Sequence, residues 1–560
     1  MNTTRFSWFW ILVLMAGSLF AQPRKVSSDL QGIDPDQRVN VIVQYRQWVE
    51  NPAREFAETP YSPAAGAMRR RGQRLRSLNL LHAVAVRMKA GATAKLAKDP
   101  NVRFIFPDRR VHAAMNYAAP TIGDDWAKGH GYKGEGVGVA LIDSGITGHW
   151  SKKTLVRQKS FVRGNSKDEY GHGTHIAGIL AGREGEEAFG IAPEVKLINL
   201  KVLDKNGQGT DSGVIKAIEY AIKEKKKYNI RVINLSLGRA VFESYQLDPL
   251  CQAVKKAWEN GIVVVVAAGN EGRNNSFGNE GYGTISSPGN SPFAITVGAM
   301  STNRTASRGD DRIASYSSKG PTLIDHIVKP DIVAPGNKII SLYAEKSTLA
   351  KEHPKNKVKM KDGSAGFELS GTSMAAPMVS GAVALLLGEE SELTPDQVKA
   401  HLMKTASKRF PATSNAQNAL TGENYTSQYD IFTVGAGYLD VMAALNNHEY
   451  APANAAALSP VVQFDGTTGD VYLVTDSSVL WGRSILWGRS EIWSTSVIWG
   501  RSVILEDNSV LWGRSVLWGR SVLWGRGDPG GFSVLWGRQS PFADSVLWGR
   551  DIEPMIYGDR

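Results

Sequence analysis

The chain has 560 residues, 42% hydrophobic and 21% charged, a composition that excludes wholesale disorder and allows several domains. Its net charge of +11 raises the question of nucleic-acid binding, but residues 22–115 alone hold 17 Lys/Arg against 8 Asp/Glu. With that segment and Arg5 set aside, the remainder carries only about +1. Most of the chain therefore has no excess positive charge for phosphates, and we expect no nucleic-acid partner.

The first 21 residues have the pattern of a secretory signal peptide. Arg5 supplies a positive start, Phe6–Phe20 is an apolar stretch of about fifteen residues, and Ala21 is small enough for a cleavage site. A buried N-terminal helix is the alternative. No later segment reaches spanning length, so we expect a secreted protein, extracellular or cell-surface associated, with no transmembrane segment in its mature form.

Residues 38–113 predict a small α+β domain. Strands with apolar alternation are expected over residues 38–45, 81–88 and 103–111, and a short helix over residues 90–102. Two β-α-β halves of this kind form a ferredoxin-like domain.

Residues 116–446 predict an α/β domain built on a parallel sheet. Segments such as residues 262–268 are apolar without alternation, as strands are when helices cover both faces of a sheet. Helices are expected around Cys251, the chain's only cysteine, and after Thr394 and Pro395, which form an N-terminal capping signal. Cys251 can form no intramolecular disulfide and is expected to be a buried small hydrophobic residue. The remaining elements are strands over residues 136–145, 195–203, 231–238, 261–270 and 293–300, and helices over residues 213–229 and 373–390.

Three polar residues occupy positions suited to nucleophilic catalysis. Asp143 ends an apolar strand, His172 lies among glycines where a helical pattern begins, and Ser373 opens a buried helix. A nucleophilic serine needs a base within hydrogen-bond reach and a carboxylate that orients the base. Singly, each has an ordinary alternative: a capping aspartate, a structural histidine and a serine N-cap. Together, in the chain order Asp–His–Ser, they predict a catalytic triad.

Residues 118–445 resemble the subtilisin-like serine proteases, or subtilases, in the motifs VALIDSGI, GHGTHIAGI, AAGNEG, KPDIVAPG and GTSMAAPMVSG. The resemblance implies a three-layer parallel-sheet catalytic domain and a serine endopeptidase that cleaves proteins or peptides through an acyl-enzyme. It implies that Asp143 orients the imidazole, that His172 acts as general base and then acid, and that Ser373 attacks the scissile carbonyl.

The resemblance also assigns residues around the triad. Asn270 would complete the oxyanion hole with the backbone N–H of Ser373, although an asparagine before glycine can be a simple turn residue. His175, the second histidine of GHGTH, would be structural. The substrate-binding segments implied are Ser236-Leu237-Gly238 and Ala267-Ala268-Gly269, as two walls of the specificity pocket, and Gly207-Gln208-Gly209 across the peptide.

Calcium is a structural cofactor that the resemblance suggests. The stretch between Asp143 and His172 is shorter than in many relatives, where a calcium-binding loop often lies. No full set of oxygen ligands can be mapped onto this stretch, so the metal residues stay unknown.

Residues 38–113 further resemble the inhibitor-type prodomain of subtilases, which would assist folding and then block the active site as an intramolecular inhibitor. The following stretch has small or apolar side chains at Val111, Ala113 and Met115. We therefore predict a zymogen that cleaves itself between Ala113 and Asn116. An ordinary accessory domain is the alternative.

A linker rich in Ala, Asn and Pro, residues 447–470, leads to a repetitive tail, residues 471–560. Because the Trp-Gly-Arg repeat has a period of six, an even number, strands would place every tryptophan on one face. The tail therefore predicts repetitive β structure, with a disordered segment as the alternative, and it offers cell-surface or substrate attachment. A rival function is a catalytically dead surface adhesin or binding protein that acts through this tail. The repeats begin at Trp481, Trp487, Trp499, Trp512, Trp518, Trp524, Trp536 and Trp548.

Overall fold

The computed structural model describes residues 25–27, 30, 33–46, 76–108, 112–113, 120–184, 187–276, 279–360, 364–464, 471–474, 503–505, 509–511 and 552–559. The expected signal peptide and the tryptophans of all eight Trp-Gly-Arg repeats lie outside these residues, as does most of the expected self-cleavage stretch.

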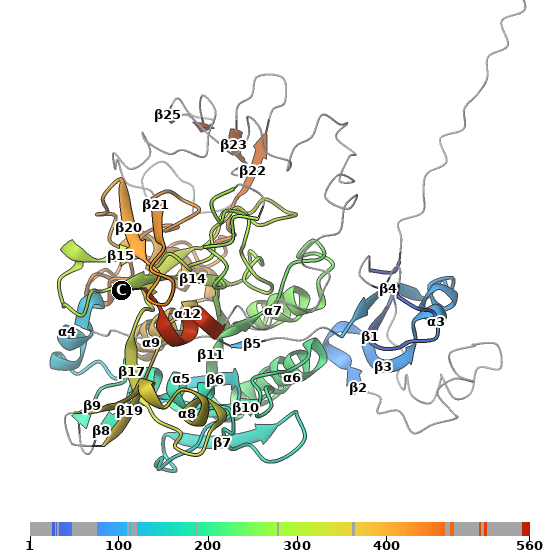
Figure 1. Ribbon diagram of the computed structural model, residues 1–560, viewed down its shortest axis with the longest axis horizontal. Coiled ribbons are helices and arrows are strands. Elements are labelled where there is room, and N and C mark those ends of the chain that lie inside the picture. Colours follow the sequence, from blue (N-terminus) through green and yellow to red (C-terminus); the bar gives the residue numbers. More distant parts are fainter. Residues whose placement is uncertain are drawn as a thin grey trace, which may run out of the picture.

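The N-terminal part of the chain forms a small sheet beside the main body (Figure 1). Its strand order is β2-β3-β1-β4, and β1 pairs antiparallel with both β3 and β4. Strands β1, β3 and β4 lie where the sequence predicts them, β2 was not predicted, and the helix ends earlier than expected, at Leu96. The elements are β1 (Arg38–Tyr45), β2 (Arg76–Leu78), β3 (Ala83–Lys89), α3 (Ala90–Leu96) and β4 (Val102–Pro107).

An eight-stranded sheet forms the centre of the body. The order is β15-β14-β13-β11-β6-β10-β7, with β16 also paired to β14, and all neighbours are parallel except β15. The five strands expected from the sequence are present, and β7, β15 and β16 extend the sheet beyond them. The strands are β6 (Gly138–Asp143), β7 (Leu155–Ser160), β10 (Lys196–Lys201), β11 (Ile230–Leu235), β13 (Val263–Ala267), β14 (Ile295–Ser301), β15 (Arg312–Ile313) and β16 (Ile332–Pro335).

Helices cover both faces of this sheet. Along β6, Val139 and Leu141 join the buried cluster that contains α5 and α9, whereas Ala140 and Ile142 join the cluster that contains α6 and α7. The strand is therefore apolar on both sides, which gives the three layers expected. The helices are α4 (Asp124–Gly129), α5 (His172–Ala181), α6 (Asp211–Tyr228), α7 (Pro249–Glu259), α8 (Thr348–Glu352), α9 (Thr372–Glu389), α10 (Pro395–Thr405) and α11 (Val441–Asn446).

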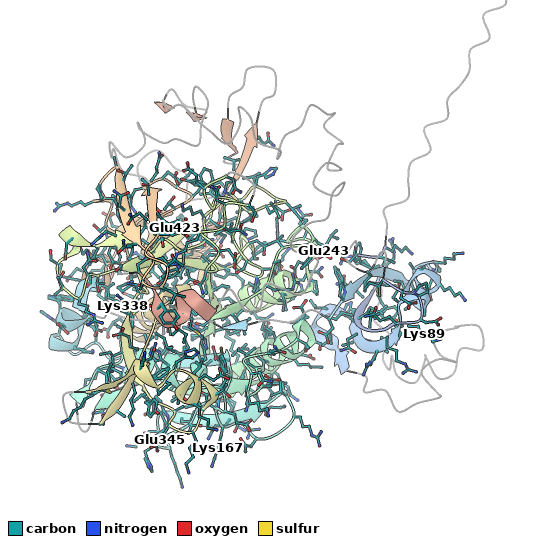
Figure 2. The ribbon with its side chains drawn as sticks, viewed as in Figure 1. Lys89, Lys167, Glu243, Lys338, Glu345 and Glu423 are labelled. Atoms are coloured by element: carbon teal, nitrogen blue, oxygen red, sulfur yellow. The ribbon has the colours of Figure 1, made fainter. Side chains whose placement is uncertain are left out.

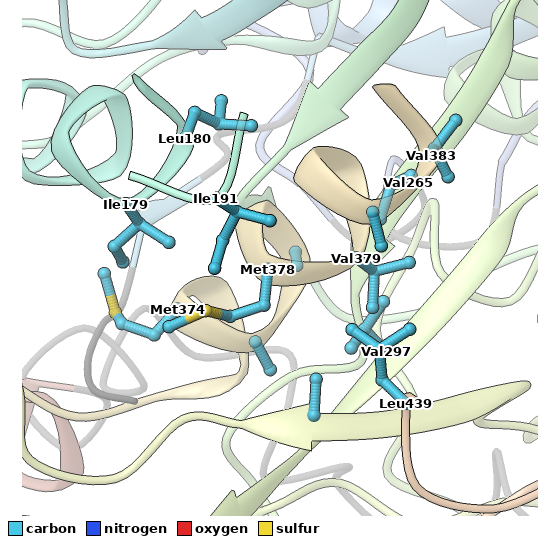
Figure 3. Packing of buried hydrophobic residues seen from close by; sticks show 14 of the residues in the cluster. Ile179, Leu180, Ile191, Val265, Val297, Met374, Met378, Val379, Val383 and Leu439 are labelled. Atoms are coloured by element: carbon cyan, nitrogen blue, oxygen red, sulfur yellow. The ribbon is translucent and has the colours of Figure 1, made fainter. Parts of the chain in front are cut away.

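Helix α9 lies in the middle of the body and is apolar on every side (Figure 3). Among the described residues it is the one helix long and apolar enough to cross a membrane, with 89% of it buried inside the protein. This corrects the expectation that no later segment reaches spanning length. The helix is apolar all round because protein surrounds it, as in the core of a large domain.

Short elements complete the described structure. They are β5 (His112–Ala113), which pairs with β12 (Leu237–Gly238); β8 (Arg183–Glu184) and β9 (Glu187–Ala188); a sheet of β17 (Ile339–Leu342), β18 (Lys357–Lys359) and β19 (Ala365–Leu369); and a hairpin of β20 (Thr413–Gln417) and β21 (Asn424–Gln428). A last sheet joins β22 (Val461–Phe464), within the expected linker, to β23 (Val471–Val474), β24 (Val503–Leu505) and β25 (Ser509–Leu511). Helix α12 (Ile552–Tyr557) returns to the body.

Cys251 lies on α7 and is only 1% exposed. Its Sγ is 3.1 Å from Asn290 Oδ1, and burial raises the pKa of the thiol well above its usual value. The expectation of a buried small residue is confirmed.

Candidate active site

The strand topology gathers the expected site residues at one edge of the sheet. β13, β11 and β6 are parallel neighbours, so their carboxyl ends lie side by side. Asp143 is the last residue of β6, Ser236 follows β11, and Asn270 lies three residues beyond β13. Open α/β sheets commonly place functional groups at this edge.

Asp143 and His172 form a buried hydrogen-bonded pair. The distance between His172 Nδ1 and Asp143 Oδ1 is 2.6 Å, and the exposed fractions of the two side chains are 0% and 1%. A ring nitrogen that donates from Nδ1 leaves Nε2 as the basic nitrogen. Gly173 lets the strand and the helix approach, because an added Cβ would lie 2.2 Å from the Gly145 carbonyl oxygen.

Asp168 holds the first turn of α5 in place. Its Oδ1 accepts hydrogen bonds from the backbone N–H of Gly171 at 2.7 Å and from Ser144 Oγ at 2.8 Å, and its Oδ2 accepts from the Thr174 N–H. Burial raises the pKa of this carboxyl, against the lowering effect of these hydrogen bonds. Asp168 was not predicted from the sequence, because it lies three residues before the N-cap Gly171, outside the usual capping position.

Ser373 is in the first turn of α9 and contacts the loop after β11. Its Oγ donates to the Ser236 carbonyl oxygen at 3.1 Å, and Ser236 Oγ donates to the Ser373 carbonyl oxygen at 2.8 Å. Asn234 Nδ2 donates to Ser236 Oγ at 2.9 Å. The side chain of Ser236 thus positions the backbone of Ser373, a role that the sequence analysis did not assign.

Asn270 lies against the residue before Ser373. Its Oδ1 accepts from the Thr372 backbone N–H at 2.9 Å and from Thr372 Oγ1 at 3.1 Å. Because two donors occupy the carbonyl end of the amide, its Nδ2 is the end that can donate to another oxygen. The structure therefore brings a side-chain donor beside the start of α9, where the Ser373 N–H also lies.

A model of the subtilase family matches residues 134–426, more than half of the chain. This range includes Asp143, His172, Asn270 and Ser373. The chain belongs to the subtilase family. Serine protease AprX of Bacillus subtilis is 37% identical over 354 residues, which cover 59% of this chain and 76% of that protein. Subtilisin DY of Bacillus licheniformis is 36% identical over 331 residues, 59% of this chain and 97% of that protein. The protein is a subtilisin-like serine protease, a hydrolase.

The second histidine of this subtilase has a different environment from the first. His175 Nε2 contacts the Phe367 carbonyl oxygen at 2.9 Å, and Ser341 Oγ donates to the His175 carbonyl oxygen. Burial lowers the pKa of His175 to about 3. A neutral imidazole that donates to a backbone carbonyl suits a structural role.

The expected substrate-binding segments border the site in different ways. Leu237–Gly238 pairs antiparallel with His112–Ala113 as β12 with β5. Ala267 ends β13, and the carbonyl oxygens of Ala268 and Gly269 accept hydrogen bonds from Ser286 and Ser318. The stretch from Gly207 through Gly209 forms no strand: Gly207 closes a turn on Asp204 and packs against the Tyr170 ring.

Metal ligands do not gather in the described part of this subtilase: no three His, Cys, Asp or Glu side chains come together there. In the stretch before His172, Asp168 is already engaged by backbone N–H groups. The described residues therefore do not fit a carboxylate-rich calcium site, and we assign none.

Proposed function

We propose that this subtilase is a secreted serine endopeptidase, made as a zymogen, in which Asp143, His172 and Ser373 form the catalytic triad. The observation that carries the proposal is the 2.6 Å hydrogen bond between His172 Nδ1 and Asp143 Oδ1. Its setting supports it, since α5, which begins at His172, packs against α9, which begins beside Ser373.

The chemistry follows from these groups. His172 Nε2 takes the proton of Ser373 Oγ as that oxygen attacks the carbonyl carbon of the substrate, and Asp143 stabilises the imidazolium that forms. The oxyanion accepts hydrogen bonds from the Ser373 backbone N–H and Asn270 Nδ2. His172 then gives its proton to the leaving amine, and water hydrolyses the acyl-enzyme with His172 again as base.

An extended peptide is the substrate class that the edge of β12 supports. Leu237–Gly238 already pairs with an extended segment of the same chain, His112–Ala113. Addition of a strand to a sheet edge recognises the peptide backbone and leaves side chains to be selected by pockets. Small residues at Ala267, Ala268 and Gly269 are consistent with a roomy apolar pocket.

Latency through the N-terminal domain is supported by its contacts. Apolar residues of its sheet, including Ile42 and Phe106, join the buried cluster of α6 and α7. Asp108 accepts from the Ser212 N–H at 2.7 Å in the first turn of α6, where a carboxylate is favoured by the helix dipole. Ser27 Oγ donates to Glu243, which faces this domain in Figure 2.

The test is Ser373→Ala in the full chain, assayed with casein and by N-terminal sequencing. We expect roughly 10⁴–10⁶-fold less activity, the scale known for triad losses in subtilisin, and a retained N-terminal domain. Ser391→Ala, an exposed serine on the same body, is the matched control. Equal hydrolysis by the two variants, or self-removal of the N-terminal domain from purified Ser373→Ala, contradicts the proposal.

Asn270→Ala separates the oxyanion hole from the triad. We expect a fall of roughly 10²–10³-fold in kcat with little change in KM, the range known for this donor in subtilisin. An unchanged kcat would assign Asn270 to the turn alone.

The adhesin alternative is not favoured, because the family match covers the body and includes all four proposed catalytic residues. Attachment through the repeats is proposed only as an accessory role. Calcium stays an expectation from family resemblance, and the proposed chemistry requires none.

A further inference from the structure

Residues 552–559, here called the docked segment, pack against the catalytic body although the whole repeat region separates them from it in sequence. Helix α12 lies next to β19 and in front of α9 in Figure 1. Within the described residues, this segment resumes the chain after residue 511. In the sequence it belongs to the expected tail, residues 471–560, and nothing in its composition marks it as part of the body.

The apolar part of the docked segment is built into the main core. Met555 is 0% exposed and Ile556 is 7% exposed, and both belong to the cluster that contains α5 and α9. The Ser370 N–H donates to the Met555 carbonyl oxygen at 2.8 Å, and Asn356 Nδ2 donates to the Ile556 carbonyl oxygen at 3.0 Å. The backbone and the side chains are therefore both recognised.

The polar part ends in a buried carboxylate. Asp559 is 1% exposed; its Oδ1 accepts from Arg273 Nη2 at 2.8 Å and from Ser315 Oγ at 2.6 Å, and its Oδ2 accepts from the Ser315 N–H at 2.7 Å. Asn337 binds the backbone of the same residue from both sides, through Oδ1 at 2.9 Å and Nδ2 at 3.2 Å. A buried carboxylate is stable only when such partners surround it, so this is a built site for an acidic residue.

Gly558 gives the site its steric selectivity. Its φ is +61°, and an added Cβ would lie 2.3 Å from Ser370 Oγ and 2.4 Å from Asn337 Oδ1. The site therefore requires glycine at position 558, the third of the four residues from Ile556 to Asp559.

The loops that form this site also carry the proposed oxyanion hole. Arg273 is three residues after Asn270, and its guanidinium stacks over Tyr316, whose carbonyl oxygen accepts from the Gly272 N–H. Ser370 is three residues before Ser373. The docked segment thus joins the loop after β13 to the start of α9.

We propose that Arg273, Ser315, Asn337 and Ser370 form a binding site for a peptide of two apolar residues followed, after one variable residue, by Gly-Asp. Its occupant is the docked segment, which holds Asn270 and Ser373 in their positions relative to each other. The effect on catalysis rests on the function proposed above, whereas the binding does not. This segment and β22 are both attached to the body, on either side of the arginine-rich stretch. A cut within that stretch leaves the docked segment bound.

The first experiment measures binding without relying on catalysis. Full-length protein is inactivated with a sulfonyl fluoride, desalted, and cut with trypsin in the repeats, where Arg550 is the last site before the docked segment. Gel filtration with mass spectrometry should find the C-terminal fragment in the peak of the body. Asp559→Asn and Gly558→Ala should each lose it, whereas Asp310→Asn, an exposed aspartate of the body, should retain it.

Separation of the wild-type fragment from the body, or its equal retention in Asp559→Asn and Gly558→Ala, overturns the proposal. Circular dichroism before trypsin treatment shows which variants have folded. Should Asp559→Asn fail to fold, Gly558→Ala gives the answer, because it keeps every charge and disturbs only the fit.

The second experiment measures the link to the oxyanion hole in uncut protein. Gly558→Ala should lower kcat on a peptide ester roughly 10–100-fold with KM little changed, since misplaced donors act on the transition state. If Gly558→Ala loses the fragment in the first experiment but keeps an unchanged kcat in the second, the proposed effect on the oxyanion hole is overturned. The binding site is then still supported. A wild-type protein without peptidase activity refutes the proposed function, while fragment retention still tests the site.

Discussion

Two segments from opposite parts of the chain cover the catalytic body, and they do so by different physical means. The N-terminal sheet, residues 38–107, lays an apolar face over α6 and α7. The docked segment inserts two side chains into the main core and closes on a buried carboxylate. The first contact covers helices that already pack on the central sheet, whereas the second completes the core itself.

The difference fits the proposed removal of the N-terminal domain and predicts that the docked segment stays. A sheet laid on helices can leave as a unit with its own small core of Val41, Val43 and Val86. Removal of the docked segment would leave a cavity in the main core where Met555 lies and would take the carboxylate partner from Arg273, and both are costly in a packed interior.

Phe106→Ala should have the largest effect, and only on the precursor. Phe106 is 0% exposed in the cluster shared with α6 and α7, so its truncation should cost about 3–5 kcal/mol. Urea unfolding of the Ser373→Ala precursor should show this loss, while mature enzyme carries no trace of the change. Lys89→Ala, at an exposed site, is the control. An equal loss of stability in the mature enzyme would contradict the expectation that only the precursor depends on Phe106.

Met555→Ala should destabilise precursor and mature enzyme alike. Its side chain is fully buried in the main core, and we expect a loss of about 2–5 kcal/mol in the free energy of unfolding. Thermal or urea unfolding of both forms measures it, with the 43% exposed Tyr557 replaced by alanine as control. A loss confined to the precursor would show that the docked segment, like the N-terminal sheet, stabilises only the precursor.

Asp108→Asn should give a smaller loss, again confined to the precursor. The variant keeps the shape but removes the charge at the N-terminus of α6, which is worth about 1 kcal/mol. The N-terminal domain should be released at lower urea in the Ser373→Ala background. Asp36→Asn, an exposed aspartate of the same domain, should leave that midpoint unchanged.

Acid sensitivity should not distinguish the two segments. Burial holds the pKa of His175 at about 3, below its usual 6.5, so between these values the unfolded chain binds the proton that the folded chain excludes. The His175 contribution should therefore make stability fall as the pH drops below 6.5, equally in precursor and in mature enzyme. Urea midpoints of both forms between pH 4 and 7 measure this, and unequal slopes would contradict it.

Much of the fold was predictable because the five expected strands of the body are continuous apolar runs between clear turns. Strand β7 was missed because Leu155–Ser160 lies at the sheet edge and is half exposed, so its apolar signal is weak. Strands β15 and β16 were missed because they have two and four residues.

The pairing of Asp143 with His172 was predictable because long motifs specify both positions. The supports around them were not: Asp168 and Ser236 act through backbone groups whose positions only the folded chain defines. The docked segment was hidden for a similar reason, since Met555 and Asp559 find their partners across residues 273–370.

The single thiol of the chain, Cys251, can report when the body opens around α7. Cys251 is sealed on α7, the helix that the N-terminal sheet covers, and only a conformation that exposes it can react with a disulfide dye. Because the sequence holds no second cysteine that could compete, the dye reports on Cys251 in precursor and in mature enzyme alike. The ratio of the two reaction rates measures how much the N-terminal sheet slows the opening that exposes Cys251.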